Sequence, residues 1–199
     1  MFFNYGEKEI LHLKSACAKL GAVIDEAGML RRRVEPEVFK GLISGIVSQQ
    51  ISTKAAVTVF ARFEALVGEV SAEAILAKSD EEIKSCGLSY RKVGYIKGVC
   101  QAVASGELKI DQLENMSDEA VIEALVKLPG IGVWSAEMLL LFSFERGNIL
   151  SYGDLVIRKG IMKLHDLESL SKKDFETYKK LYSPYGSVAS LYLWHFGNE

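Results

Sequence analysis

Apolar residues recur every three or four positions over most of the chain, which is the period of an α-helix with one buried face. Residues 7–20 show it at Ile10, Leu13, Cys17 and Leu20. Few runs alternate with period two, so strands are not expected and the sequence predicts an all-α fold. The predicted helices cover residues 7–20, about 36–67 (with Pro36 in the first turn), about 80–86, 92–104, 117–128, 133–144, 155–164 and about 172–182.

Polar residues and glycine mark several ends of these helices. Ser79 with Glu82, and Ser171 with Asp174, have the spacing of a capping box at a helix start. Gly87 supplies a stop for the helix that begins after Ser79, because glycine readily adopts the left-handed conformation found at helix C-termini.

The sequence "LPGIG", residues 128–132, separates two predicted helices, the first of which has Ser117 as its N-cap. Pro129 cannot donate the hydrogen bond that would continue that helix, and Gly130 and Gly132 tolerate positive φ. Backbone amides at the start of the second helix would then be open to an anion such as phosphate. A tight helical hairpin that only packs two helices explains the same turn, and the turn alone does not decide between the two.

Composition narrows the class of protein. The 199 residues are 49% hydrophobic and 25% charged, enough for a sizeable core, and the formal net charge is −2. That charge counts against a protein that coats nucleic acid, although local basic clusters such as Arg91 and Lys92 remain. No apolar stretch is long enough to span a membrane and the N-terminus lacks the features of a signal peptide, so we expect a cytoplasmic protein without membrane contact.

Cysteine and histidine give no sign of a metal site. The three cysteines are odd in number and widely spaced, which argues against disulfides and close ligand pairs. The three histidines are equally scattered. These residues are Cys17, Cys86, Cys100, His12, His165 and His195.

The hairpin region resembles the helix-hairpin-helix of the HhH-GPD DNA glycosylases, whose pattern is L-P-G-[IV]-G-x-x-[ST]-A followed by a Gly/Pro/Asp segment with a catalytic aspartate. Residues 128–136 read LPGIGVWSA, and "ILSYGDLVIRKGI" follows with Asp154. "FKGLISGIVSQQIS" and "SPYGSVASLYLWHF" are similar to the first core helix and the closing helix of that family. The resemblance covers nearly the whole chain from residue 36 onward.

The resemblance implies a single two-lobed helical unit with the active-site cleft between the lobes. One lobe would combine about residues 1–35 and 145–199, and the other would hold the hairpin within about residues 36–144. Relatives with an extra N-terminal β-domain are longer, so we expect the compact form.

Trp134 indicates the branch of the family. Members that also cut the DNA strand carry a lysine there, which forms a Schiff base, so a tryptophan implies a glycosylase without lyase activity. "GIGVWSA" is similar to the 3-methyladenine DNA glycosylase II group, which removes alkylated bases such as 3-methyladenine and 7-methylguanine. The iron–sulfur cluster of the endonuclease III branch needs four cysteines near the C-terminus, and no cysteine follows Cys100.

Asp154 is the catalytic residue that the resemblance implies. A carboxylate would stabilise the positive charge that develops on the sugar and position or deprotonate the attacking water. A place just before a helix would keep it ionised. For an aspartate at a helix start, a purely structural N-cap is the ordinary interpretation, and only the hairpin at the family's spacing favours catalysis.

Because the target atom lies inside the duplex, the nucleotide must be flipped into a pocket. Aromatic rings suit a cationic alkylated base through stacking and cation–π attraction. By resemblance Trp134 and Tyr185 line this pocket, although large rings at helical spacing usually pack in a core. Met138 and Gly186 depart from residues that are aromatic and basic in some members, and Met138 would be a soft apolar contact.

The resemblance also implies the DNA contacts. Tyr90, or Leu88 as the alternative, would intercalate where the base leaves the stack, and Arg91 and Lys92 would hold phosphates; an ordinary helix–helix turn is the other interpretation. Gln49 and Gln50 resemble a polar pair near the opposite base, and buried hydrogen bonds would explain them equally. The hairpin would contribute Gly130, Ile131, Gly132 and Val133.

The family's hairpin also holds a monovalent cation, so Leu128 and Gly130 are candidate carbonyl ligands for Na⁺ or K⁺, and no other cofactor is expected. The partner would be double-stranded DNA with alkylated bases, bound by a monomer. Two alternatives stay open. One is a glycosylase of the same fold for another damaged base, and the other is a DNA-binding module that has lost catalysis.

Overall fold

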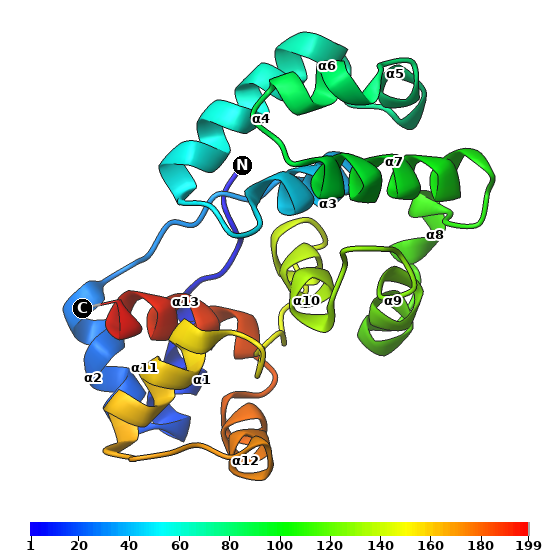
Figure 1. Ribbon diagram of the computed structural model, residues 1–199. Helices are drawn as coiled ribbons and strands as arrows, with labels where there is room; N and C mark the ends of the chain where they lie inside the picture. Colours follow the sequence, from blue (N-terminus) through cyan, green and yellow to red (C-terminus); the bar gives the residue numbers. More distant parts are fainter. Residues whose placement is uncertain (199) are drawn as a thin grey trace. The chain divides into compact units, whose positions relative to one another are not determined.

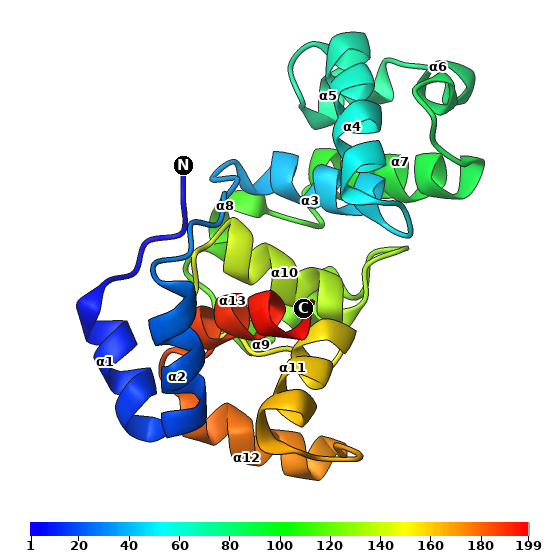
Figure 2. The same ribbon diagram turned by 90° about the vertical axis from the view of Figure 1, so that its left-hand side faces the viewer.

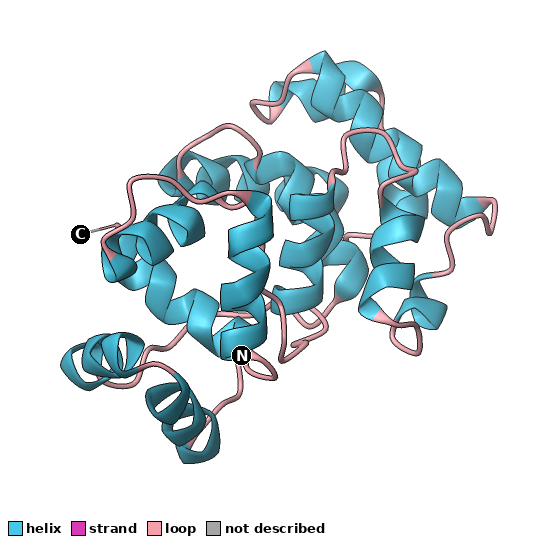
Figure 3. Ribbon diagram, turned by 90° about the horizontal axis from the view of Figure 1, so that it is seen from below, coloured by secondary structure: helices cyan, strands magenta, loops and turns pink. Residues whose placement is uncertain are grey.

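The computed structural model describes residues 1–198, and these are helical, with connecting loops and one isolated antiparallel bridge between Phe2 and Arg33 (Figure 3). The all-α prediction is confirmed for this part of the chain. None of its helices is both long and apolar enough to cross a membrane. The helices are α1 Glu7–Ala16, α2 Ala18–Ala27, α3 Val38–Ser48, α4 Thr53–Val67, α5 Ala72–Leu76, α6 Asp80–Ser85, α7 Tyr90–Ala104, α8 Ile110–Leu113, α9 Asp118–Leu125, α10 Val133–Phe142, α11 Leu155–His165, α12 Lys172–Tyr182 and α13 Gly186–Gly197.

The chain forms two compact units. The terminal unit combines residues 1–34 with the chain from Leu140 onward, and the central unit is Glu35–Leu139. Helix α10 begins in the central unit and ends in the terminal one. Asp154 and Tyr185 therefore belong to the terminal unit, and the hairpin belongs to the central unit.

Helix α13 is the core of the terminal unit, buried from Gly186 to Leu193, with α1, α2, α11 and α12 packed on it (Figures 1 and 2). Its closest approach is to α11, because a Cβ on Gly160 would lie only 2.6 Å from the Leu193 carbonyl oxygen. This packing fixes α11, whose N-cap is Asp154.

The predicted single helix over residues 7–20 was wrong, because the structure has two helices, α1 and α2, that lie side by side (Figure 2). Cys17 adopts an extended conformation between them, and its Sγ accepts a hydrogen bond from the Leu20 amide. Cys17 is buried and continues the apolar pattern, so periodicity does not reveal that it caps α2.

The predicted single helix over about 36–67 was also wrong. Helix α3 ends at Ser48, Gln50 has φ +57°, and Ser52 caps α4 by accepting from the Ala55 amide. The helical spacing of apolar residues continues across this break, and only the serine cap marks it in the sequence.

The predicted caps are present at three helix starts. Ser79 and Glu82 form the reciprocal capping box of α6, and Ser117 caps α9. Ser171 caps α12 through the Asp174 amide, and its hydroxyl also donates to the Asp174 carboxylate. The short helices α5 and α8, of five and four residues, were not predicted, because fewer than two turns give too little periodicity.

Candidate functional site

The hairpin turn between α9 and α10 is held by helix α7. Gly130 has φ +81°, and a Cβ there would overlap the ring of Tyr95, so both backbone conformation and packing require glycine. One turn further along α7, a Cβ on Gly98 would lie 3.0 Å from Cγ of Pro129. The turn is therefore a rigid element clamped against α7, with its geometry fixed before any ligand binds.

The start of α10 faces solvent. Leu128 and Ile131 are buried and anchor the turn, whereas Gly132, Val133 and Trp134 are exposed. The amides of the first helical turn have no partner within their own helix, and the aligned peptide dipoles place positive charge there. This end of α10 can accept a phosphate in the way that the sequence predicts.

The turn's carbonyl groups have partners within the protein. The Leu128 carbonyl accepts from the Ile131 amide at 3.3 Å, and the Gly130 carbonyl accepts from Nε2 of Gln49 at 2.8 Å. Each carbonyl oxygen keeps a second lone pair, so the monovalent-cation site at Leu128 and Gly130 stays a prediction.

Asp154 is the N-cap of α11 and is 7% exposed. Its Oδ1 accepts from the amides of Val156 at 2.9 Å and Ile157 at 3.0 Å. These two N–H donors at the start of the helix hold the carboxylate in one orientation. The cap role and a catalytic role are compatible, because the cap is what positions the carboxylate.

Arg158, one helical turn after Asp154, is a neighbour that the sequence did not single out for the site. Its guanidinium lies 5.1 Å from the centre of the Tyr152 ring, and its Nε is buried without a hydrogen-bond partner among the described residues. The spacing i, i+4 from an aspartate was the signal that could have found it.

The predicted pocket residues lie in both units. Trp134 and Met138 are four residues apart on α10 and share one face of it; the Trp134 side chain is 43% exposed and Met138 is half-buried. Tyr185, half-buried, precedes α13 in the terminal unit, where the His12 ring meets its ring edge-on at 5.0 Å between centroids.

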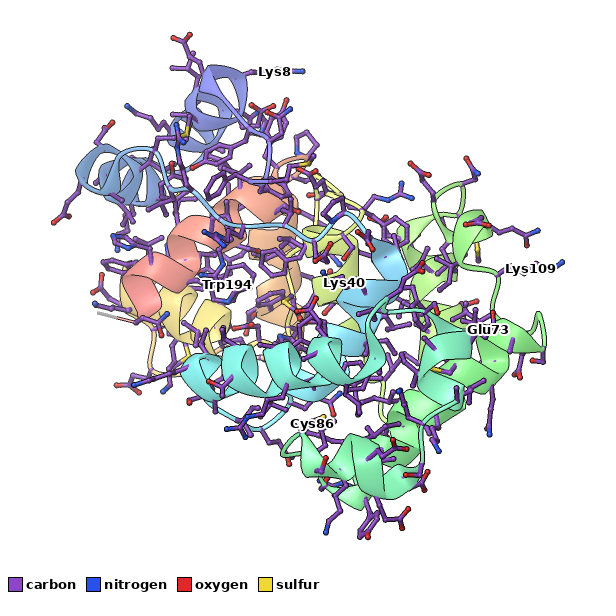
Figure 4. The ribbon with its side chains drawn as sticks, turned by 90° about the horizontal axis from the view of Figure 1, so that it is seen from above. Lys8, Lys40, Glu73, Cys86, Lys109 and Trp194 are labelled. Carbon is purple, nitrogen blue, oxygen red and sulfur yellow. The ribbon has the colours of Figure 1, made fainter. Side chains whose placement is uncertain are left out.

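Trp194, on α13, packs with Phe142 and Arg32. It stacks on Phe142 at 5.7 Å, and the Arg32 guanidinium lies 5.8 Å from the centre of each ring. Its position on α13 is marked in Figure 4.

Tyr90, the first residue of α7, is 54% exposed, as an intercalating side chain requires. The Lys84 ammonium lies 4.7 Å from the centre of its ring. Leu88, the predicted alternative, is only 5% exposed and packs inside the central unit directly after Gly87, whose φ is +107°. Leu88 is therefore not a wedge in this structure.

Lys92 was predicted to hold a phosphate, but in the structure it binds backbone carbonyls of the protein itself. Its ammonium donates to the carbonyl oxygens of Val47 at 2.7 Å and Gln49 at 2.6 Å, at the C-terminal end of α3. Burial lowers the pKa of this lysine, and the neighbouring charge of Arg91 adds to the effect. Arg91 itself is exposed and donates to Oε1 of Gln50 at 3.3 Å, so it remains the candidate phosphate contact of this pair.

Comparison with known proteins agrees with these features. Residues 43–184 match the family described as HhH-GPD superfamily base excision DNA repair protein. The chain belongs to the HhH-GPD superfamily. The predicted family and its helical fold are thereby confirmed.

Among similar HhH-GPD proteins, DNA-3-methyladenine glycosylase 1 of Schizosaccharomyces pombe is 34% identical over 169 residues, covering 82% of this chain and 74% of the relative. A crystal structure of a DNA-3-methyladenine glycosidase from Bacillus halodurans has 36% identity and a TM-score of 0.85, covering 99% of this chain and 92% of that one. The S. pombe 3-methyladenine DNA glycosylase in complex with abasic DNA has 31% identity and a TM-score of 0.84, with 94% and 95% coverage.

Proposed function

We propose that this HhH-GPD protein is a monofunctional DNA glycosylase that removes alkylated purines such as 3-methyladenine and 7-methylguanine. The observation that carries the proposal is the buried carboxylate of Asp154, fixed at the start of α11 by two backbone amides. Relatives and structural neighbours above 30% identity carry the name 3-methyladenine glycosylase, which supports the substrate class.

The reaction needs a negative charge more than an acid. A purine alkylated at N3 or N7 carries a positive charge, so it leaves as a neutral base and takes both electrons of the bond to C1′. Positive charge then develops on the sugar, where the Asp154 carboxylate would stabilise it. Water attacks C1′ and loses a proton to Asp154 or to solvent, which leaves an abasic site and the free base.

Trp134 supports hydrolysis without strand cleavage. Cleavage by β-elimination requires an amine that forms a Schiff base with the opened sugar, and an indole has no such nucleophile. Its exposed ring at the start of α10 can instead stack on a flipped cationic base.

Double-stranded DNA is the proposed partner of a monomeric protein. The exposed amides at the start of α10 would bind the backbone, and Tyr90 would fill the gap left by the flipped nucleotide. The proposal assigns no organic cofactor and no iron–sulfur cluster, because Cys17, Cys86 and Cys100 are dispersed among different helices and loops of the two units.

The test measures release of 3-methyladenine and 7-methylguanine from methylated duplex DNA by the wild type and by Asp154→Asn. An asparagine oxygen can still cap α11, so we expect at least about a hundredfold slower release with binding of an abasic-site duplex retained. Asp166→Asn is the matched control: Asp166 lies at the other end of α11 with φ +56°, which asparagine tolerates, and we expect full activity.

Two outcomes would overturn the proposal. If the wild type binds an abasic-site duplex but releases neither base, the protein acts on another lesion or is a binding module. If Asp154→Asn releases both bases at the wild-type rate, the carboxylate has no catalytic role.

A further inference from the structure

The side chains of Lys92 and Gln49 join three elements of the central unit by hydrogen bonds: α7, the end of α3 and the hairpin turn. The Lys92 ammonium of α7 donates to the last carbonyls of α3, those of Val47 and Gln49. The side-chain amide of Gln49 in turn donates to the Gly130 carbonyl of the hairpin turn at 2.8 Å. The path therefore runs from the helix that carries Tyr90, through the end of α3, to the turn that precedes α10.

Lys92 fixes the backbone from which the Gln49 side chain projects. The last carbonyls of a helix lack partners within it and carry its negative dipole end, so an ammonium that binds two of them is strongly favoured there. The chain then turns sharply at Gln50, with φ +57°. Within residues 1–198, the Lys92 ammonium is the one hydrogen-bond donor to the Gln49 carbonyl.

Gln49 controls the plane of one peptide in the hairpin. A peptide group is planar, so a hydrogen bond to the Gly130 carbonyl fixes the orientation of the whole Gly130–Ile131 peptide. Gly132 follows this peptide and precedes Val133, the first residue of α10. The hydrogen bond from Gln49 thus adds to the packing of the turn on Tyr95 and Gly98 of α7 in holding the peptide that precedes these amides.

We propose that Lys92 and Gln49 are positioning residues, which set the hairpin amides in register with the Tyr90 wedge and so determine affinity for DNA rather than the rate of base release. The inference rests on the proposed function, since it assumes that the hairpin and Tyr90 contact DNA. It replaces the sequence-based expectation that Lys92 and Gln49 themselves contact DNA.

The test measures affinity for a duplex that contains a tetrahydrofuran abasic site, together with the single-turnover rate of 7-methylguanine release at saturating protein. Gln49→Glu removes the donor to Gly130, and Lys92→Met removes the donor to α3. Each should weaken DNA binding about tenfold, and the single-turnover rate should stay within about twofold.

Matched controls separate this effect from changes of charge. Gln101→Glu adds the same charge on the exposed side of α7, and Lys109→Met removes an ammonium that points away from the protein (Figure 4). Both should bind the abasic duplex as the wild type does. Thermal unfolding of every variant shows whether the protein remains folded, and Gln49→Met, which adds no charge, replaces Gln49→Glu if the carboxylate prevents folding.

The double variant Gln49→Glu with Lys92→Met gives a readout that independent structural roles would not produce. Residues acting in one path are not additive, so the double variant should bind only about tenfold more weakly than the wild type, as each single variant does. A loss of about a hundredfold, unchanged affinity in the single variants, or a slower single-turnover rate with normal affinity would each overturn the inference. Because affinity for the abasic duplex is measured without base release, a failure of the proposed activity would be recognised separately.

Discussion

At the scale of single residues, His165 shows how burial links protonation to stability. Its Nε2 lies 3.1 Å from the hydroxyl of Tyr182 and 4.0 Å from Sγ of Cys17. Burial lowers the pKa of His165 below 6.5, the charge of Lys19 lowers it further, and Asp166 opposes the shift. The folded protein therefore favours the neutral ring.

This histidine should make the protein less stable in acid. Below about pH 6.5 the unfolded chain binds a proton on His165 more readily than the folded protein does, so its contribution is complete above that pH and is lost as pH falls. Thermal unfolding between pH 7.5 and 5.5 should show a smaller loss for His165→Gln than for the wild type. Lys19→Met, which removes the repelling charge, should lie between them; equal losses in all three would contradict the assignment.

The residues of the candidate site differ in how far the sequence could predict them. The position of Asp154 at the start of a helix could be predicted, because an aspartate before a helical pattern is recognisable in the sequence. Leu88 and Lys92 could not be predicted correctly, since one is buried and the other binds the end of a helix more than 40 residues away in sequence. Local patterns do not contain such tertiary contacts.

At the scale of helices, glycine has opposite effects in two places. Gly160 lets α11 contact the backbone of α13, whereas a Cβ on Gly94 in α7 would meet nothing within 4 Å. Gly160→Ala should destabilise the protein by about 1–2 kcal/mol, because overpacking exceeds the gain in helix propensity. Gly94→Ala should stabilise it by about 0.5–1 kcal/mol through propensity alone. Denaturant unfolding of both variants measures this, and a stabilising Gly160→Ala would contradict the close packing of α11 on α13.

Helix starts were better predicted than helix breaks. The serine caps of α6, α9 and α12 are where the sequence places them, because a cap is a local interaction between residues three apart. The breaks at Cys17 and at Gln49–Ser52 were missed, because apolar spacing continues across them and the cap at Cys17 is a thiol. Helices shorter than two turns leave no periodic pattern to recognise.

At the scale of the whole molecule, 24 basic and 26 acidic residues leave a net charge of −2. Such a protein cannot bind DNA through its overall charge, which would repel the phosphates at long range. Under the proposed function, binding would depend on the backbone amides at the start of α10, on Tyr90, and on a few local cations such as Arg91. The net charge thus agrees with a small, specific contact and disagrees with a broad basic surface.

The salt dependence of DNA binding tests this description. Each phosphate neutralised by a cation changes the slope of log K against log salt by about 0.9, so two or three such contacts predict a slope of about −2 to −3. Arg91→Gln should reduce its magnitude by about one, because the exposed guanidinium would release one counterion. Lys109→Gln should leave it unchanged. Binding of an abasic duplex measured across a range of salt concentrations decides the matter, since a slope that Arg91→Gln does not alter would place the phosphate contacts elsewhere on the protein.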